Sequence, residues 1–267
     1  MIGPREVTRE ERMKIAYIIA NQLLEKYGTD VEAIGIYGSL ARKTDGPFSD
    51  IEIKCILNSL EDDFSYEWTS GDWKAEVNLD NKESIVEEAT TVEEDWPLTH
   101  GQFYTILPIY DPKGFFQELR QKASSVDNTV FKEAICKTLV EEMYEYIGKL
   151  RNITIQGPET FLPILAIKIA TSGAMILGLH NKRYFTTAAQ VLPEALVLSN
   201  RPRGFDKLCQ LVMSGHLYDS KRILDACENF WSGLLDWSKE NGYIIYYSNC
   251  VPFQPKDFVI PAFFRCF

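Results

Sequence analysis

The chain has 267 residues, of which 45% are hydrophobic and 25% are charged, and its formal net charge is −10. These values are typical of globular proteins and argue against a disordered chain, and the length suits one large domain or two of ordinary size. The N-terminus runs directly into charged residues without an apolar signal core, and the apolar stretch 161–179 is interrupted by Pro163 and Lys168. We therefore expect a cytoplasmic protein with no membrane-spanning helix.

The first half of the chain predicts a sheet flanked by helices. A capping box at Thr8 and Glu11 begins the first helix, because apolar residues recur at helical spacing after it. Ser70, Gly71 and Asp72 separate two alternating segments, as in a hairpin. The predicted helices of this half are 8–27, 40–43 and 82–89. The predicted strands are 33–37, 50–57, 64–69, 73–79 and 102–110.

The second half shows helical spacing almost throughout. Its predicted helices are 130–151, 160–179, 188–198, 204–213 and 219–240. The expected fold class is therefore α+β, with a mixed-sheet domain over 1–126 followed by a helical domain over 127–267. The tail from Pro252 to Phe267 contains three prolines and five phenylalanines without a clear period. We expect its aromatic side chains to pack on this subunit or on a neighbour.

The negative charge is concentrated in the first half of the chain. Residues 1–126 hold 24 acidic and 13 basic residues, whereas residues 127–267 hold 14 and 15. The segment 61–95 alone has 13 acidic residues and two basic ones. Such a field repels nucleic acid and attracts a polycation. A solvated acidic face that keeps the protein soluble is the alternative interpretation.

The most informative pattern for chemistry is Gly38-Ser39, followed after ten residues by Asp50-Ile51-Glu52. On a strand, Asp50 and Glu52 point to the same face, where two ionised carboxylates are unfavourable unless a cation lies between them. Oxygen ligands of this kind favour Mg²⁺, which binds one or two carboxylates together with water and substrate phosphates. Gly38 lets the backbone approach a phosphate, and Ser39 offers a hydroxyl and an N–H group.

A third carboxylate follows on a later alternating strand. Lys74, Glu76 and Asn78 share one face of that strand. If it pairs beside the Asp50 strand, Glu76 completes an acidic cluster. An Asp-x-Glu pair alone is usually a solvated strand face, so the prediction depends on the combination.

The pattern resembles the core motif of the polymerase-β-like nucleotidyltransferases. Four further segments are similar to the kanamycin nucleotidyltransferase family, which comprises the aminoglycoside 4′-O-nucleotidyltransferases. These segments are Ile36-Tyr-Gly-Ser-Leu40, Thr44-Asp-Gly-Pro47, Asp95-Trp-Pro-Leu-Thr-His-Gly-Gln102 and Gly148-Lys-Leu-Arg-Asn152. The resemblance extends over residues 1 to about 253.

The resemblance implies transfer of a nucleoside monophosphate from Mg²⁺-ATP, or another nucleoside triphosphate, to the 4′-hydroxyl of kanamycin-type aminoglycosides. It also implies a homodimer whose active sites combine the N-terminal domain of one subunit with the helical domain of the other. By the same resemblance, Asp50 and Glu52 bind the metal and Glu145 is the catalytic base. The implied nucleotide contacts are Gly38, Ser39, Arg42 and Lys149. The implied substrate contacts are Glu67, Lys74, Glu76, Asp95, Glu141 and Glu145.

Alternatives to this function remain open. Glu141, Glu145 and Lys149 form one stripe on a helix, and by pattern alone they are an exposed Glu–Lys pair of small energetic value. The acceptor could be another aminoglycoside, a lincosamide or a protein hydroxyl. A non-catalytic module that only binds a polycation is a further alternative, but such a module does not need Ser39 and the metal pair.

Overall fold

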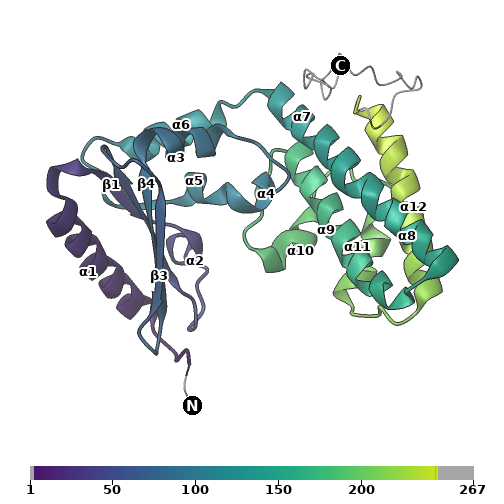
Figure 1. Cartoon of the computed structure of the whole chain (residues 1–267), viewed down its shortest axis with the longest axis horizontal. Coiled ribbons are helices and arrows are strands. Elements are labelled where there is room, and N and C mark those ends of the chain that lie inside the picture. The colour runs from purple at the N-terminus through teal and green to yellow at the C-terminus, as the bar shows by residue number, and fades with distance from the viewer. Residues whose placement is uncertain (1–2, 244, 246–267) are drawn as a thin grey trace. The chain divides into compact units, whose positions relative to one another are not determined.

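A computed structural model describes residues 3–243 and 245 (Figure 1). The predicted aromatic tail, Pro252 to Phe267, lies outside these residues. The described chain divides into two compact units. Unit 1 contains residues up to 91 together with 100–126, and unit 2 contains residues 92–99 together with the described residues from 127 onward. Residues 92–99 therefore pack with the helical unit, although they were assigned to the first domain by sequence.

Unit 1 is built on a five-stranded mixed sheet with the order β3-β4-β2-β1-β5. The parallel pair is β2 with β4, and the other neighbours are antiparallel. The strands are β1 (Val31–Ile36), β2 (Ile51–Leu57), β3 (Phe64–Thr69), β4 (Lys74–Asn81) and β5 (Leu107–Tyr110). The predicted α+β class with an N-terminal mixed sheet is confirmed.

Helices cover both faces of this sheet (Figure 1). On one face, α1 (Arg9–Tyr27) packs through Ala16 and Ile19 onto apolar side chains of β1, β2 and β4. This helix begins at Thr8 with the predicted capping box. The other face carries three helices, α3 (Lys82–Thr90), α5 (Gly101–Thr105) and α6 (Phe115–Ser124). A 3-10 turn, Gly28–Asp30, precedes β1, and the short helix α2 (Gly38–Arg42) follows β1.

The predicted strand 102–110 is half wrong. Gln102–Thr105 belongs to α5, and only Leu107–Tyr110 forms a strand. Phe103 and Ile106 are three residues apart, and both are buried in the core against α6. That spacing places both side chains on one face of a helical turn, whereas a strand would send them to opposite faces.

Unit 2 is helical, as predicted, and its helices pack around α9. Gly173 on α9 allows a close approach of Phe230, because an added Cβ would lie 2.6 Å from the Phe230 ring. The helices are α4 (Trp96–Thr99), α7 (Asn128–Thr138), α8 (Glu145–Gln156), α9 (Leu162–His180), α10 (Val191–Ala195), α11 (Phe205–Met213) and α12 (Ser220–Glu240). Three short turns join them, namely the π-helical Leu139–Tyr144 and the 3-10 turns Glu159–Phe161 and Ala188–Gln190.

Two predicted helices of unit 2 differ from the observed ones. The helix predicted at 130–151 extends to Gln156 and contains the π-helical turn before Glu145. The helix predicted at 188–198 is a 3-10 turn followed by Val191–Ala195. A π-helical turn is common at functional sites, and sequence periodicity does not distinguish it from an α-helical turn.

The apolar helix α9 passes the length and composition test for a membrane span, over the segment Glu159–His180. However, 72% of its most apolar window is buried inside the protein. A core helix of a folded domain passes the same test. The expectation that the chain does not enter a membrane stays a prediction.

Candidate active site

Three carboxylates lie in a row across the sheet of unit 1. In the strand register, Glu52 of β2 is directly opposite Glu76 of β4, and Glu76 is directly opposite Glu67 of β3. All three side chains therefore leave the same face of the sheet. The condition set for Glu76, that its strand pairs beside the strand that follows Asp50, is met. Like charges at directly opposite positions destabilise a sheet, so this row favours a site for a cation.

The carboxylate of Glu52 lies directly against Gly38. A Cβ added at Gly38 would lie 1.6 Å from Glu52 Oε2, which is inside the van der Waals contact distance. Gly38 also has a φ of +68°, in the left-handed region that side chains rarely occupy. The glycine is therefore required both by its own backbone and by its neighbour.

Glu52 is held in an environment that disfavours its charge. Burial, together with the negative charges of Asp50 and Glu76, raises the pKa of Glu52 from 4.5 to about 7. Arg42 and a hydrogen bond from the backbone N–H of Ser39 oppose this rise. A bound cation would relieve the same repulsion.

Lys74 connects two of the acidic residues on this face. Its Nζ lies 2.9 Å from Glu67 Oε2 and 3.8 Å from Asp50 Oδ2. The hydrogen bond to Glu67 is the main reason why the pKa of Lys74 is raised. All of these side chains are partly solvent-exposed, so a ligand can reach them.

Arg42, on α2, has an unsatisfied donor next to this face. Its buried Nε has no hydrogen-bond partner among the residues that the structure describes. Buried donors of this kind are normally satisfied, by protein, water or a bound group. The positive charge near Glu52 and the open donor make Arg42 suitable for contact with a phosphate.

The residues present fit a magnesium ion. Among the described residues, no three or more His, Cys, Asp and Glu side chains gather closely enough to form a metal cage of their own. Mg²⁺ does not need one, because one or two carboxylates with water and substrate phosphates are its usual ligands. Asp50 and Glu52 supply such a pair, since burial and next the negative charge of Asp50 raise the pKa of Glu52.

The loop that leads to Asp50 is anchored by a buried ion pair. Arg12 and Asp45 bond to each other, and each side chain is only 2% exposed. Arg9 also binds Asp45, and Arg12 donates to the backbone oxygens of Val7 and Pro47. Burial alone would raise the pKa of Asp45, but the hydrogen bonds from Arg12 and Arg9 outweigh it and lower the pKa. Arg9, Arg12 and Asp45, here called the clamp, fix the loop five residues before Asp50.

The other predicted site residues belong to unit 2. Glu145 and Lys149 form an exposed ion pair one turn apart on α8. The hydrogen bond from Lys149 to Glu145 raises the pKa of Lys149. Glu141 lies in the π-helical turn just before α8, and Asp95 is exposed just before α4. Exposed pairs of this kind form on many helices, so the pair alone does not indicate a function.

Sequence reasoning assigned no role to Tyr37 or Asn78, which bond to the acidic row. Tyr37 Oη donates to Glu76 Oε1 over 3.0 Å, and Asn78 Nδ2 lies 2.8 Å from the same oxygen. Tyr37 directly precedes the Gly38 motif, and Asn78 shares the strand face of Glu76. These two positions are the only features of the sequence that could have indicated a role for Tyr37 and Asn78 in the site.

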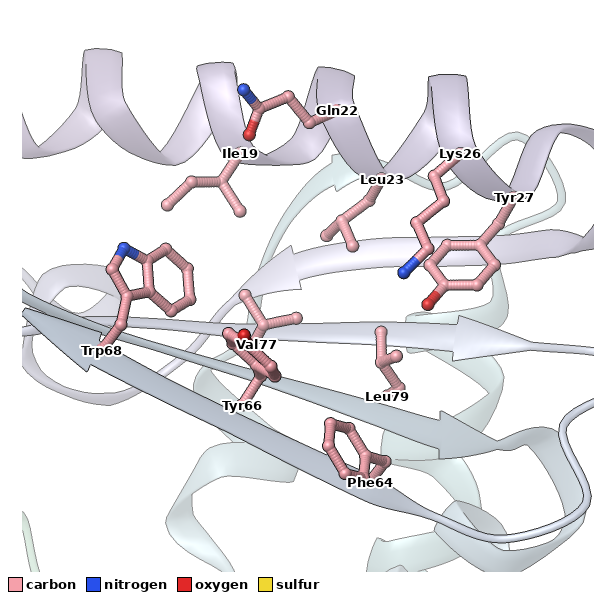
Figure 2. Close-up of a pocket in the computed structure, with 10 residues that line it drawn as sticks. All are labelled: Ile19, Gln22, Leu23, Lys26, Tyr27, Phe64, Tyr66, Trp68, Val77 and Leu79. Atoms are coloured by element: carbon pink, nitrogen blue, oxygen red, sulfur yellow. The ribbon is translucent and has the colours of Figure 1, made fainter.

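A pocket of about 360 Å³ lies on the opposite face of the sheet, between α1 and strands β3 and β4 (Figure 2). Tyr66 and Trp68 alternate with Glu67 along β3, so they point away from the acidic row. The pocket is mainly apolar and is not part of the candidate site. Its lining residues are Ile19, Gln22, Leu23, Lys26, Tyr27, Phe64, Tyr66, Trp68, Val77 and Leu79.

The chain is similar to two curated proteins named "Aminoglycoside nucleotidyltransferase (4')", one from Staphylococcus aureus and one from Bacillus sp. Each is 53% identical over 253 residues, which are 95% of this chain and 100% of the relative. The family described as the KNTase C-terminal domain matches residues 113–244.

A solved structure is similar in fold. It is that of a nucleotidyltransferase-like protein from Exiguobacterium sibiricum 255-15, with a TM-score of 0.51 and 12% identity. The match covers 84% of this chain and 77% of that chain. At this identity the likeness supports the fold alone.

Proposed function

This chain belongs to the aminoglycoside 4′-nucleotidyltransferases, a family of nucleotidyl-transferring enzymes, and on that premise we propose its reaction. The enzyme transfers AMP from Mg²⁺-ATP to the 4′-hydroxyl of kanamycin-type aminoglycosides and releases pyrophosphate. Modification of that hydroxyl confers resistance to the antibiotic. The acidic row of Glu52, Glu76 and Glu67 is the observation that carries this proposal, because it forms an anionic face suited to a metal-bound nucleotide beside a polycationic sugar.

The nucleotide binds at the Gly38 end of the site. Asp50 and Glu52 would hold Mg²⁺, which supplies positive charge that stabilises the phosphoryl oxygens as pyrophosphate leaves. Ser39 and Arg42 contact the triphosphate, and the unsatisfied Nε of Arg42 supports this role. Gly38 keeps this surface open, because a larger residue would push Glu52 out of place.

The acceptor is held by the remaining carboxylates. Aminoglycosides carry several ammonium groups, and Glu67, Glu76, Asp95 and Glu141 are proposed to bind them. Lys74 bonds to Glu67 in the structure. When the drug binds, Lys74 either releases Glu67 to an ammonium group of the drug or shares Glu67 with it. Several such contacts restrict which hydroxyl can reach the α-phosphorus.

In the reaction, the 4′-oxygen forms a bond to the α-phosphorus while the bond from that phosphorus to the β-phosphate oxygen breaks. Glu145 accepts the proton of the 4′-hydroxyl, and base catalysis of this kind typically contributes about 10²–10⁴-fold. Lys149 lies one helical turn from Glu145 and binds the α-phosphate, where negative charge accumulates. Both side chains are exposed on α8, so they are accessible to substrates.

Further parts of the proposal concern assembly and location. A homodimer is proposed in which the unit 1 carboxylates of one copy, Asp50, Glu52, Glu67 and Glu76, act with Glu145 and Lys149 of the other. The enzyme is proposed to act in the cytoplasm, where ATP is available, without binding nucleic acid or a membrane.

The reaction can be tested with purified full-length protein by following pyrophosphate release from ATP. We expect release only when both Mg²⁺ and kanamycin B are present, and a product heavier than the drug by one AMP group. The matched control is 3′,4′-dideoxykanamycin B, which has the same ammonium groups but no 4′-hydroxyl, and it should give no product.

Three outcomes would contradict the proposal. Binding of kanamycin without pyrophosphate release would favour the non-catalytic polycation-binding alternative. Equal turnover of the dideoxy compound would move the acceptor to another hydroxyl. Full activity in EDTA would remove the metal from the reaction.

A further inference from the structure

The hydrogen bonds around Glu76 form a closed ring of three side chains. Tyr37 Oη lies 3.0 Å from Glu76 Oε1, Asn78 Nδ2 lies 2.8 Å from the same oxygen, and Asn78 Nδ2 lies 2.7 Å from Tyr37 Oη. Asn78 has two N–H hydrogens, so it can donate one to each partner. Tyr37 accepts from Asn78 and donates to Glu76. Each of the three hydrogen bonds of the ring therefore has a donor and an acceptor.

Both bonds to Glu76 end on one oxygen. Oε1 receives the two donors, and Oε2 receives no hydrogen bond from the part of the chain that the structure describes. A carboxylate that is held by one oxygen has a fixed plane, and its other oxygen points in one direction. Such an oxygen is prepared to accept a hydrogen bond from a cationic group without losing much conformational entropy.

Tyr37 is well suited to hold this geometry because it is itself fixed. Its side chain is only 9% exposed, and it lies in the core between the sheet and the helices α3, α5 and α6. Lys54 Nζ lies 5.6 Å from the centre of its ring, and Lys54 is held by Asp80 at 3.3 Å.

We propose that Tyr37 and Asn78 are positioning residues that orient Glu76 so that its free oxygen binds an ammonium group of the acceptor. This inference rests on the proposed function and adds two residues to it. Neither residue touches the reacting atoms. Their effect passes through Glu76, and it concerns the binding of the acceptor, whereas Ser39 and Arg42 concern the nucleotide.

A double-mutant cycle tests the inference. Tyr37→Phe removes only the hydroxyl, and we expect the kcat/KM for kanamycin to fall about 10-fold while the KM for ATP changes less than about twofold. In a Glu76→Gln background the same substitution should cost less than about twofold, because the charged partner is already absent. Asn78→Ala provides a second, independent cycle with the same expected pattern.

Tyr104→Phe is the matched control. The Tyr104 hydroxyl donates over 3.0 Å to the backbone oxygen of Ala123, away from the acidic row, so its removal should lower the melting temperature without changing either KM. The inference is overturned if Tyr37→Phe costs the same factor with and without Glu76, or if it raises the KM for ATP as much as that for kanamycin. Wild-type protein is assayed first, and a wild type that releases no pyrophosphate with kanamycin contradicts the proposed function itself.

Discussion

Gly38 and Glu52 illustrate how one residue determines the state of another. The positive φ of Gly38 and the absence of a side chain let the Glu52 carboxylate lie where a Cβ would otherwise be. In that position Glu52 is partly buried and close to Asp50 and Glu76, which raises its pKa to about 7. Gly38 therefore allows the position in which Glu52 has its raised pKa.

This pKa predicts how the stability of the metal-free protein depends on pH. The pKa of Glu52 is 4.5 without these interactions and about 7 in the folded protein, so the folded state binds its proton more tightly. The contribution of Glu52 to stability is thus full below about pH 4.5 and is lost as the pH rises through about 7. The glutamine side chain in the variant Glu52→Gln does not titrate. Between about pH 4.5 and 7 we therefore expect the unfolding free energy of the variant to fall by about 1–3 kcal/mol less than that of the wild type.

Urea unfolding in EDTA at several pH values measures this difference. Glu87→Gln, at an exposed position on α3, is the control and should follow the wild type. Parallel pH curves for wild type and Glu52→Gln would show that Glu52 is not held in the environment described.

At the scale of elements, the clamp of Arg9, Arg12 and Asp45 joins α1 to the loop that ends at Asp50. The ion pair between Arg12 and Asp45 is buried, so removing one partner leaves an uncompensated charge. The start of β2, and with it the direction of Asp50, depends on this loop. Within the motif Thr44-Asp-Gly-Pro47, Asp45 and the backbone oxygen of Pro47 therefore anchor the loop to α1.

We expect Asp45→Asn to lower the unfolding free energy by about 3–5 kcal/mol, because Arg12 keeps its charge without a counter-ion. Asp72→Asn is the matched control, since Asp72 pairs with Arg5 at the surface over 3.2 Å, and it should change stability by less than about 0.5 kcal/mol. Chemical denaturation of the three proteins distinguishes these values. Equal small effects of both substitutions would mean that the clamp does not hold the loop.

The elements also show what the sequence could predict. Local patterns were sufficient for the helix that begins at Thr8 and for the alternating face of Lys74, Glu76 and Asn78, because each depends on neighbours in the chain. The pairing of Glu52 with Glu76 could be stated only as a condition, since β2 and β4 are not consecutive strands and no local pattern determines that they pair.

Other features depend on tertiary contacts and were not predicted. Residues 102–105 were assigned to a strand by sequence, but burial of Phe103 and Ile106 in one cluster selects a helix. The ring of Tyr37, Asn78 and Glu76 closes between residues 39 positions apart in the sequence, so no local pattern contains it. The clamp on Asp45 is of the same kind.

For the whole molecule, the residues of the proposed site are divided between the two units of the chain. Unit 1 carries Asp50 and Glu52, and unit 2 carries Glu145 and Lys149. In the proposed homodimer each active site takes one set from each copy. Two inactive variants, each damaged in a different set, should then repair each other in one dimer.

The most direct measurement is activity after co-expression of differently tagged Asp50→Asn and Glu145→Gln chains. Each variant alone should lose at least about 100-fold in kcat while keeping its fold, because one lacks a proposed metal carboxylate and the other the proposed base. A random mixture of dimers should recover about a quarter of wild-type activity, since half of the dimers are mixed and each of those has one intact site. Mixed dimers, verified by their two tags, that show no activity above the single variants would contradict the shared site, and wild-type kcat in Asp50→Asn alone would contradict the role of the acidic face in catalysis.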